Sequence, residues 1–425
     1  MVSPQWEPSA LAGELWESSP VQWLEVPGRS NKLAFKALKQ AALPHSEAVV
    51  IVTGFNESLL KFVDLAADFH GAGFAVYLFD HSGQGLSERE ACVPENRLQN
   101  AFVSSFQDCF VSDLIHIVDA HIAPQHPKVH VFAHSMGCLV TAHALSQRPE
   151  LFGRVVMSAP AFSIVWGDKP PGLPAIGTKL LSFFGTGLGA QYRLAPAPGG
   201  ELSWWNPHAP ITGVLLTHNQ ERLRWYEDLR SQHPEIAMRG LSMGWLWEVT
   251  AAQDRLWTGD AVDRIQAPVL VLTAELDTIV HAEGQARFCR STPRSTRVLV
   301  PGAYHELVFE TPKIRNPVVA AALAWVKAPV QGPDPDPEHG EIQVVQRARQ
   351  EQRLSGDAIV VQPQACGSKA VEPDTSLLAS GAAFLGFGVP EDTGGAIVGL
   401  ALIGAGAATA TAIGLALLIT RRQRL

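Results

Sequence analysis

The amino-acid sequence predicts an α/β fold, in which helices cover both faces of a mostly parallel central β-sheet. One observation is that short β-rich runs alternate with longer helical patterns from about residue 21 to residue 327. Another is that several of these runs are continuously apolar, which indicates strands buried on both faces. In addition, 46% of the 425 residues are hydrophobic and 17% are charged, which indicates a large core.

The expected elements follow one another along this region. We expect the clearest strands at residues 48–53, 75–79, 129–133, 154–158, 269–273 and 296–300. We expect helices at residues 59–71, 102–121 and 136–147. Pro149 and Gly153 mark the exit from the last of these helices.

Residues 161–260 interrupt the alternation, which predicts a helical cap inserted into a sheet domain that spans residues 21–327. The segment opens with the Gly- and Pro-rich run WGDKPPGLPAIG and holds seven of the chain's 11 tryptophans. Its aromatic residues either line an apolar binding face or pack the cap against the sheet, and both roles stay open. They are Phe183, Phe184, Trp204, Trp205, Trp225, Trp245, Trp247 and Trp257.

The composition changes outside the sheet domain. Residues 1–20 form an N-terminal extension, and residues 328–376 form a Pro- and acid-rich linker that we expect to be disordered. Residues 394–420 carry no charge and are rich in Ala, Gly, Leu and Ile. A helix of this length exceeds the hydrocarbon core of about 30 Å, so we predict a transmembrane helix. The alternative is a Gly- and Ala-rich tail of low complexity, which would end in the same basic residues 421–425.

Charge and composition bear on location and partners. The first 20 residues have no basic stretch of the kind that opens a secretory signal peptide, so we expect a membrane anchor with a cytoplasmic catalytic domain. The basic end TRRQRL instead favours a cytoplasmic C-terminus, which leaves the topology open. A net charge of -8 argues against nucleic acid as a partner. The five cysteines lack metal-binding spacing, and we expect neither a metal nor an organic cofactor.

The strongest local motif is VHVFAHSMG, residues 129–137. A β-rich run ends at Ala133, Ser135 follows, and helix formers begin at Met136, which is the strand–nucleophile–helix context of a nucleophile elbow. Gly137 supplies the small residue that the tight turn requires, whereas Ala133 replaces the first glycine of the usual G-x-S-x-G pattern. We therefore expect an exposed nucleophilic hydroxyl on Ser135.

A serine hydroxyl needs a base, and the base needs an acid to orient it. In this type of fold both follow late strands, in the order Ser, Asp, His. Asp277 follows the run PVLVLTAEL, and His305 follows TRVLVPGAY. Glu275 is a competing acid, and His281 is a competing base that comes too early in this order.

Two backbone amides are expected to form an oxyanion hole. One belongs to Met136, at the start of the helix after the nucleophile. The other belongs to Phe55, because Gly54 lets the chain turn sharply after the strand at 48–53. The later loop 80–87, DHSGQGLS, lacks a third glycine and a helix, so we interpret it as structural and not as a dinucleotide site.

These residues resemble the monoacylglycerol lipase and lysophospholipase L2 branch of the α/β-hydrolases, within the serine aminopeptidase S33-type hydrolases. The resemblance covers residues 21–326 and rests on TGFNESLLKF, FDHSGQGLSER, VFAHSMG, MSAP and GAYHELVFE. It implies a triad of Ser135, Asp277 and His305. It also implies an oxyanion hole from the Phe55 and Met136 amides, and Glu57 matches a loop glutamate that we interpret as structural.

The resemblance implies a serine hydrolase that cleaves an acyl ester of a monoacyl glycerolipid, with water as second substrate. An acyltransferase or a peptidase with the same triad stays open. A catalytically silent binding module is a further alternative, against which the ordered triad argues. The acyl-chain and head-group preferences are not readable from the sequence.

Overall fold

The computed structural model describes residues 7–40, 46–165, 191–192, 216–238, 240–328 and 362–364. The chain divides into two compact units, Met1–Ser368 and Lys369–Leu425. All described residues belong to the first unit. The expected segments 394–420 and 421–425, and most of the expected linker 328–376, lie outside the described residues.

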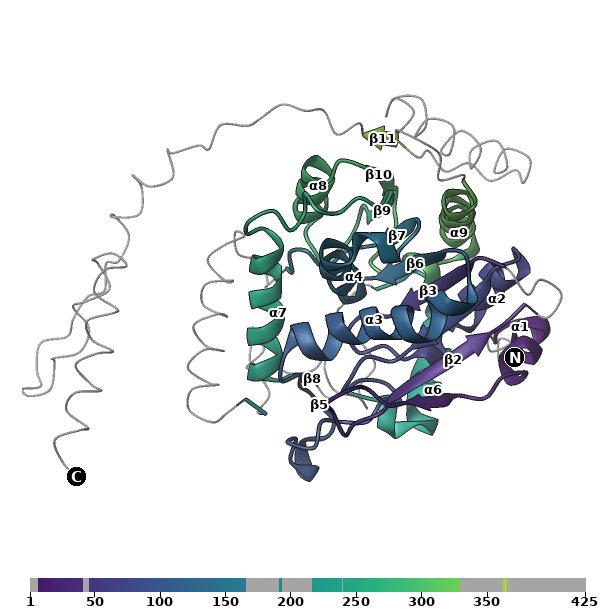
Figure 1. The fold of residues 1–425 in the computed structure, drawn as a ribbon. Helices are drawn as coiled ribbons and strands as arrows, with labels where there is room; N and C mark the ends of the chain where they lie inside the picture. Colours follow the sequence, from purple (N-terminus) through teal and green to yellow (C-terminus); the bar gives the residue numbers. More distant parts are fainter. Residues whose placement is uncertain are drawn as a thin grey trace, which may run out of the picture. The chain divides into compact units, whose positions relative to one another are not determined.

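A nine-stranded sheet organises the described residues (Figure 1). Its strand order is β1-β2-β4-β3-β6-β7-β9-β10-β11. All neighbours from β4 to β10 pair in parallel, whereas β1, β2 and β11 pair antiparallel at the two edges. The strands are β1 (Gln22–Leu24), β2 (Leu33–Leu38), β3 (Ala48–Val52), β4 (Ala75–Phe79), β6 (Val129–His134), β7 (Val155–Ser158), β9 (Val269–Ala274), β10 (Ser295–Val300) and β11 (Gln362–Gln364).

Helices cover both faces of this sheet (Figure 1). On one face the core includes side chains of α1 (Ala10–Glu17), α2 (Val63–Gly71) and α9 (Pro312–Lys327). On the other face it includes side chains of α3 (Ser112–His116), α4 (Met136–Gln147), α7 (Met243–Leu256) and α8 (Ala282–Ser291). Successive residues of β3 alternate between the two cores because side chains of a strand point to opposite faces. The sheet is therefore buried on both sides, as the apolar runs predicted.

The six expected strands agree with β3, β4, β6, β7, β9 and β10 to within one residue at each end. The sequence missed β2, although it is buried along its length. Lys36 interrupts its apolar pattern, and the structure shows why a lysine is tolerated there: its ammonium group lies 4.4 Å from the centre of the Trp16 ring. The lysine also donates a hydrogen bond to the carbonyl of Ser19.

The helix expected at 102–121 begins later than predicted. Asn100–Ala101 forms the short strand β5, which pairs in parallel with β8 (Gly240–Leu241), so the chain enters the helix only at Gln107. Residues Gln107–Val111 and Ile117–Ile122 on either side of α3 are π-helical. The helix expected at 136–147 coincides with α4, and the one expected at 59–71 begins with a 3-10 turn before α2.

Part of the expected cap is described. Between β7 and β9 the chain forms α6 (Gln220–Gln232), β8 and α7. Of the aromatic residues expected in this region, Phe183, Phe184, Trp204 and Trp205 lie outside the described residues. Where the structure describes the chain, no helix has both the length and the apolar character needed to cross a bilayer.

Candidate active site

Ser135 lies in a sharp turn between β6 and α4. Its φ angle is +51°, a left-handed conformation that L-residues adopt rarely and at a cost in energy. A Cβ atom at Gly137 would lie 2.5 Å from the carbonyl oxygens of Val52 and Thr53. Only glycine therefore allows α4 to begin this close to β3, as expected for a nucleophile elbow.

Neighbouring strands hold the turn in place. The Ser135 amide donates a hydrogen bond to the carbonyl of Ser158, at the end of β7, over 2.9 Å. The Ser135 carbonyl accepts one from the Ala161 amide at 3.1 Å. These bonds offset the cost of the left-handed backbone and fix the direction of the side chain.

The three residues that the sequence selected meet at one place. The Ser135 hydroxyl donates to Nε2 of His305 at 2.9 Å, and Nδ1 of His305 donates to Oδ2 of Asp277 at 2.8 Å. The second carboxylate oxygen of Asp277 accepts the amides of Ile279 and Val280 at 2.8 and 3.0 Å. The arrangement is a hydrogen-bonded relay from a buried carboxylate through an imidazole to a hydroxyl.

The competing residues have other partners. The carboxylate of Glu275 accepts the Gly302 amide at 2.7 Å and is exposed. His281 immediately precedes α8, and its backbone amide donates to the carbonyl of Ser163. Neither side chain takes part in the relay.

The electrostatics of the relay favour a basic imidazole. Burial alone would lower the pKa of His305, but the negative charges of Asp277, Glu306 and Glu57 raise it above its ordinary value. Burial alone would raise the pKa of Asp277, but His305 and two backbone amides lower it. Asp277 therefore stays ionised beside a ring that readily accepts a proton.

The expected oxyanion loop follows β3 and lies beside Ser135. The Gly54 amide donates to the carboxylate of Glu57, and the Asn56 amide donates to Oε1 of Gln84 at 3.0 Å. The peptide group that joins Gly54 to Phe55 carries the Phe55 amide. The bonds of the Gly54 and Asn56 amides hold the peptide groups before and after it, which fixes the orientation of the Phe55 amide.

Gly54 is needed for a reason different from the expected one. Its φ angle is not positive, and the left-handed residue of the loop is Asn56, at +57°. A Cβ at Gly54 would lie 2.8 Å from Oε2 of Glu57 and 3.1 Å from the Cβ of Ser135. Glycine therefore provides space between the loop and the elbow, not a sharp turn.

The loop 80–87 supports this part of the site. The carboxylate of Asp80 accepts hydrogen bonds from the Ser58 hydroxyl and from the amides of Leu59 and Leu86, at 2.9, 2.6 and 2.7 Å. Together with the bond from Gln84, these contacts tie the loop to the segment after β3, in keeping with a structural role.

The cap also contacts the oxyanion loop. The Phe55 ring packs against the buried ring of Trp245, in α7, with ring centres 4.6 Å apart. The Met238 amide donates to the side-chain oxygen of Asn56 at 3.3 Å. By contrast, Trp257 packs against Phe162, away from this loop.

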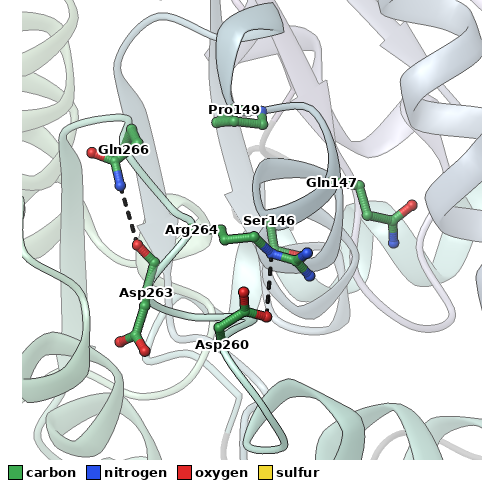
Figure 2. A pocket seen from close by; sticks show the side chains of 7 residues that line it. All are labelled: Ser146, Gln147, Pro149, Asp260, Asp263, Arg264 and Gln266. Atoms are coloured by element: carbon green, nitrogen blue, oxygen red, sulfur yellow. Dashed lines mark hydrogen bonds and ion pairs between the residues drawn. The ribbon is translucent and has the colours of Figure 1, made fainter.

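A hollow lies at the far end of α4 from the nucleophile (Figure 2). It encloses about 600 Å³ and is bordered by Ser146, Gln147, Pro149, Asp260, Asp263, Arg264 and Gln266. The 12 residues of α4 separate it from Ser135 by about 18 Å, at 1.5 Å per residue. It is thus no part of the relay.

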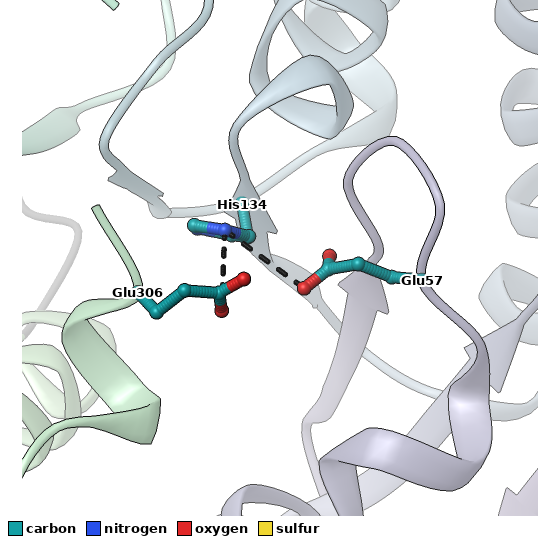
Figure 3. A group of neighbouring side chains, drawn as sticks. All are labelled: Glu57, His134 and Glu306. Carbon is teal, nitrogen blue, oxygen red and sulfur yellow. Dashed lines mark ion pairs between the residues drawn. The ribbon is translucent and has the colours of Figure 1, made fainter. Parts of the chain in front are cut away.

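The sequence missed a cluster of charges beside the relay (Figure 3). Glu57, His134 and Glu306 lie close enough to hold a metal ion. However, the ammonium group of Lys61 already contacts both carboxylates, at 2.6 and 2.5 Å. The positive charge that this cluster requires therefore comes from a lysine.

The chain is similar in sequence to known hydrolases. The family model described as serine aminopeptidase, S33 matches residues 44–312. A probable lysophospholipase L2 of Haemophilus influenzae is 28% identical over 320 residues, which cover 74% of this chain and 95% of that protein. The monoglyceride lipase of Rattus norvegicus is 26% identical over 285 residues, which cover 66% and 82%.

A solved structure shows the same fold. It is a soluble variant of monoglyceride lipase from Saccharomyces cerevisiae, in complex with a substrate analog. The match has a TM-score of 0.53 at 19% identity and covers 72% of this chain and 95% of that one. The predicted α/β-hydrolase fold with a mostly parallel sheet is confirmed.

Proposed function

Because the chain belongs to the serine aminopeptidase S33 family of hydrolases, we propose that it is a carboxylic ester hydrolase that acts on monoacyl glycerolipids. Ser135 is the nucleophile, His305 the general base and Asp277 the acid that orients the base. The observation that carries this proposal is the continuous relay of two hydrogen bonds that joins the three side chains, at 2.8 and 2.9 Å.

The relay supports a two-step acyl transfer. His305 accepts the hydroxyl proton of Ser135 as the oxygen attacks the ester carbonyl, and the imidazolium is stabilised by Asp277. The ring then protonates the leaving alcohol, which leaves an acyl group on Ser135. The same ring activates a water molecule that releases the fatty acid.

The amides of Phe55 and Met136 hold the oxyanion that forms on the substrate carbonyl. Two features support this role: the position of Met136 at the N-terminus of α4 and the fixed orientation of the Phe55 peptide. Each such donor contributes about 3 kcal/mol to stabilisation of the transition state.

The substrate class follows from the relatives. Lysophospholipase L2 and monoglyceride lipase are names of enzymes whose substrates carry one acyl chain on glycerol. The ring of Phe55, which is partly exposed and packs against the buried Trp245, belongs to the oxyanion loop, where an acyl chain is expected under the cap. Trp257 has the second expected role, packing of the cap against the domain.

A substrate panel tests the proposal. Purified full-length chain is assayed with lysophospholipids, monoacylglycerols, diacyl lipids and peptides, with and without added alcohols. Release of fatty acid from the monoacyl lipids is expected. Dominant peptide cleavage or acyl transfer to alcohol would favour the peptidase or acyltransferase alternative, and absence of both turnover and fluorophosphonate labelling would favour a silent binding module.

We also propose the domain organisation from the sequence: a catalytic domain at residues 21–327, a linker at 328–376 and a membrane-spanning helix at 394–420. The uncharged character of the last segment supports it. If the proposal holds, a chain truncated after residue 376, which keeps β11, leaves the membrane fraction and stays active. Protease protection in intact vesicles then tests whether the catalytic domain is cytoplasmic.

A further inference from the structure

Lys61 joins two loops that carry different parts of the site. It bonds to Glu57, in the loop after β3, and to Glu306, which directly follows His305. Lys61 and Glu306 are 245 residues apart in the sequence. Glu57 also accepts the Gly54 amide, so this ion cluster links the proposed oxyanion loop to the proposed base.

The cluster is buried. The side chains of Lys61 and Glu57 are each 4% exposed, and that of Glu306 is 10% exposed. Burial opposes the charge on Lys61, but the two carboxylates raise its pKa above the ordinary value, so it stays protonated. Three charges are therefore held in fixed positions next to the relay, where water screens them little.

The cluster carries one negative charge in excess, because two carboxylates face one ammonium group. His134 adds none: burial lowers its pKa to about 3, and its Nε2 lies 3.9 and 3.7 Å from oxygens of Glu57 and Glu306. The ring of His134 packs against that of His305, with centres 5.0 Å apart. The negative charges that raise the pKa of His305 include Asp277 and the two carboxylates of this cluster, Glu306 and Glu57.

We propose that Lys61, Glu57 and Glu306 are positioning residues, which hold the oxyanion loop against the base and whose excess negative charge stabilises the imidazolium formed on His305. The inference rests on the proposed hydrolase function. The proposal has two parts: the charge of the cluster stabilises the imidazolium, and the bonds of the cluster hold the oxyanion loop against the base. One variant tests each part.

Glu306→Gln tests the charge effect. The amide oxygen still accepts the bond from Lys61, but one negative charge is lost. The pKa of His305 then falls, so the acidic limb of the pH profile of kcat/KM moves to lower pH. The plateau of kcat/KM falls about 10-fold, because the imidazolium in the transition state is less stable.

The double variant Lys61→Met/Glu306→Gln tests the geometric effect. It removes one positive and one negative charge. The cluster then carries only the negative charge of Glu57, so its net charge is the same as in the wild type. The acidic limb stays near its wild-type position. The plateau falls by up to about 100-fold, because the oxyanion loop is no longer tied to the base.

Asp113→Asn is the matched control. Asp113 is a buried carboxylate in α3, paired with Arg29, and it belongs to no part of the relay or the cluster. Its replacement by an amide removes a buried ionisable carboxyl group elsewhere in the domain, one whose pKa burial raises to about 7. Circular dichroism and the thermal midpoint show whether each variant is folded.

The outcomes separate this inference from the proposed function. Lack of lipid hydrolysis and of probe labelling at Ser135 in the wild-type chain contradicts the proposed function itself. If the wild type is active, the pH profile of kcat/KM for Glu306→Gln is compared with those of the wild type and of Asp113→Asn. The charge effect is overturned if the acidic limb and the plateau are the same in all three proteins. Wild-type turnover by a folded double variant overturns the geometric effect; should that variant not fold, Lys61→Gln/Glu306→Gln, which makes the same change in charge, is measured in its place.

Discussion

The ring of His305 is held by Asp277 through a bond of 2.8 Å between Nδ1 and Oδ2. The carboxylate is 4% exposed and the ring 5% exposed, so the bond is shielded from water. The two residues are 28 positions apart and follow adjacent parallel strands, β9 and β10. The sheet thereby fixes which nitrogen of the ring faces Ser135.

The pH dependence of activity follows from this bond. His305 must be neutral to accept a proton, and kcat/KM falls as the pH drops below its raised pKa. Asp277→Asn removes the main charge that raises this pKa, so the acidic limb moves to lower pH. The plateau falls about 10⁴-fold, because the ring loses its orientation and its counter-charge.

The measurement is the pH profile of kcat/KM on a soluble monoacyl ester. Glu275→Gln is the control, because this nearby exposed carboxylate bonds the Gly302 amide and takes no part in the relay. A limb that stays in place in Asp277→Asn, or one that moves equally in Glu275→Gln, would mean that another group orients the base.

The elbow gives a prediction about stability. Gly137→Ala places a methyl group against two backbone oxygens, both 2.5 Å away, and neither can move without disturbing β3. We expect a loss of about 3 kcal/mol, a magnitude typical of overpacked cores. Thermal denaturation measures it.

A second glycine provides the matched control. Gly13 lies in α1, where an added Cβ would meet nothing within 4 Å. Gly13→Ala should raise stability by about 0.5–1 kcal/mol, because alanine favours the helix. Equal thermal midpoints for the two variants would be incompatible with the close approach of α4 to β3.

The left-handed conformation of Asn56 predicts a difference between two substitutions. Asn56→Val forces a β-branched residue to φ of +57°, at a cost of about 1–2 kcal/mol, or displaces the loop. A displaced Phe55 amide would lower kcat by about 10²-fold, as does loss of one oxyanion donor. Asn56→Gly keeps the conformation available and should retain most of the activity. Steady-state kinetics of the pair test this, and equal kcat values would argue against a strict geometry of the loop.

Six strands of the sheet were predictable, most of them because they are continuous apolar runs. The start of α4 was predictable because the elbow motif places a helix directly after Ser135. The relay was predictable for a similar reason: Asp277 and His305 each follow an apolar run directly. The structure brings Asp277 and His305 together with Ser135, and we propose their catalytic roles on that basis.

Long-range relationships were not predictable. The contact of Lys61 with Glu306 has no local pattern, because 245 residues separate them and each looks like an ordinary surface charge in the sequence. Gly54 was selected for a turn, but only coordinates show that it makes room for Glu57. Strand β2 was not predicted because Lys36 interrupts its apolar run. The packing of Lys36 against Trp16 depends on α1, which precedes β2 in the chain.

The most direct measurement is the trapping of the acyl intermediate. The full-length chain is mixed with a lysophospholipid, quenched in acid within milliseconds and digested for mass spectrometry. We predict an acyl group on the peptide that contains Ser135. We predict none in Ser135→Ala, whose thermal midpoint is unchanged and whose turnover falls about 10⁶-fold. An acyl group on another residue, or turnover retained by purified Ser135→Ala, would contradict this prediction.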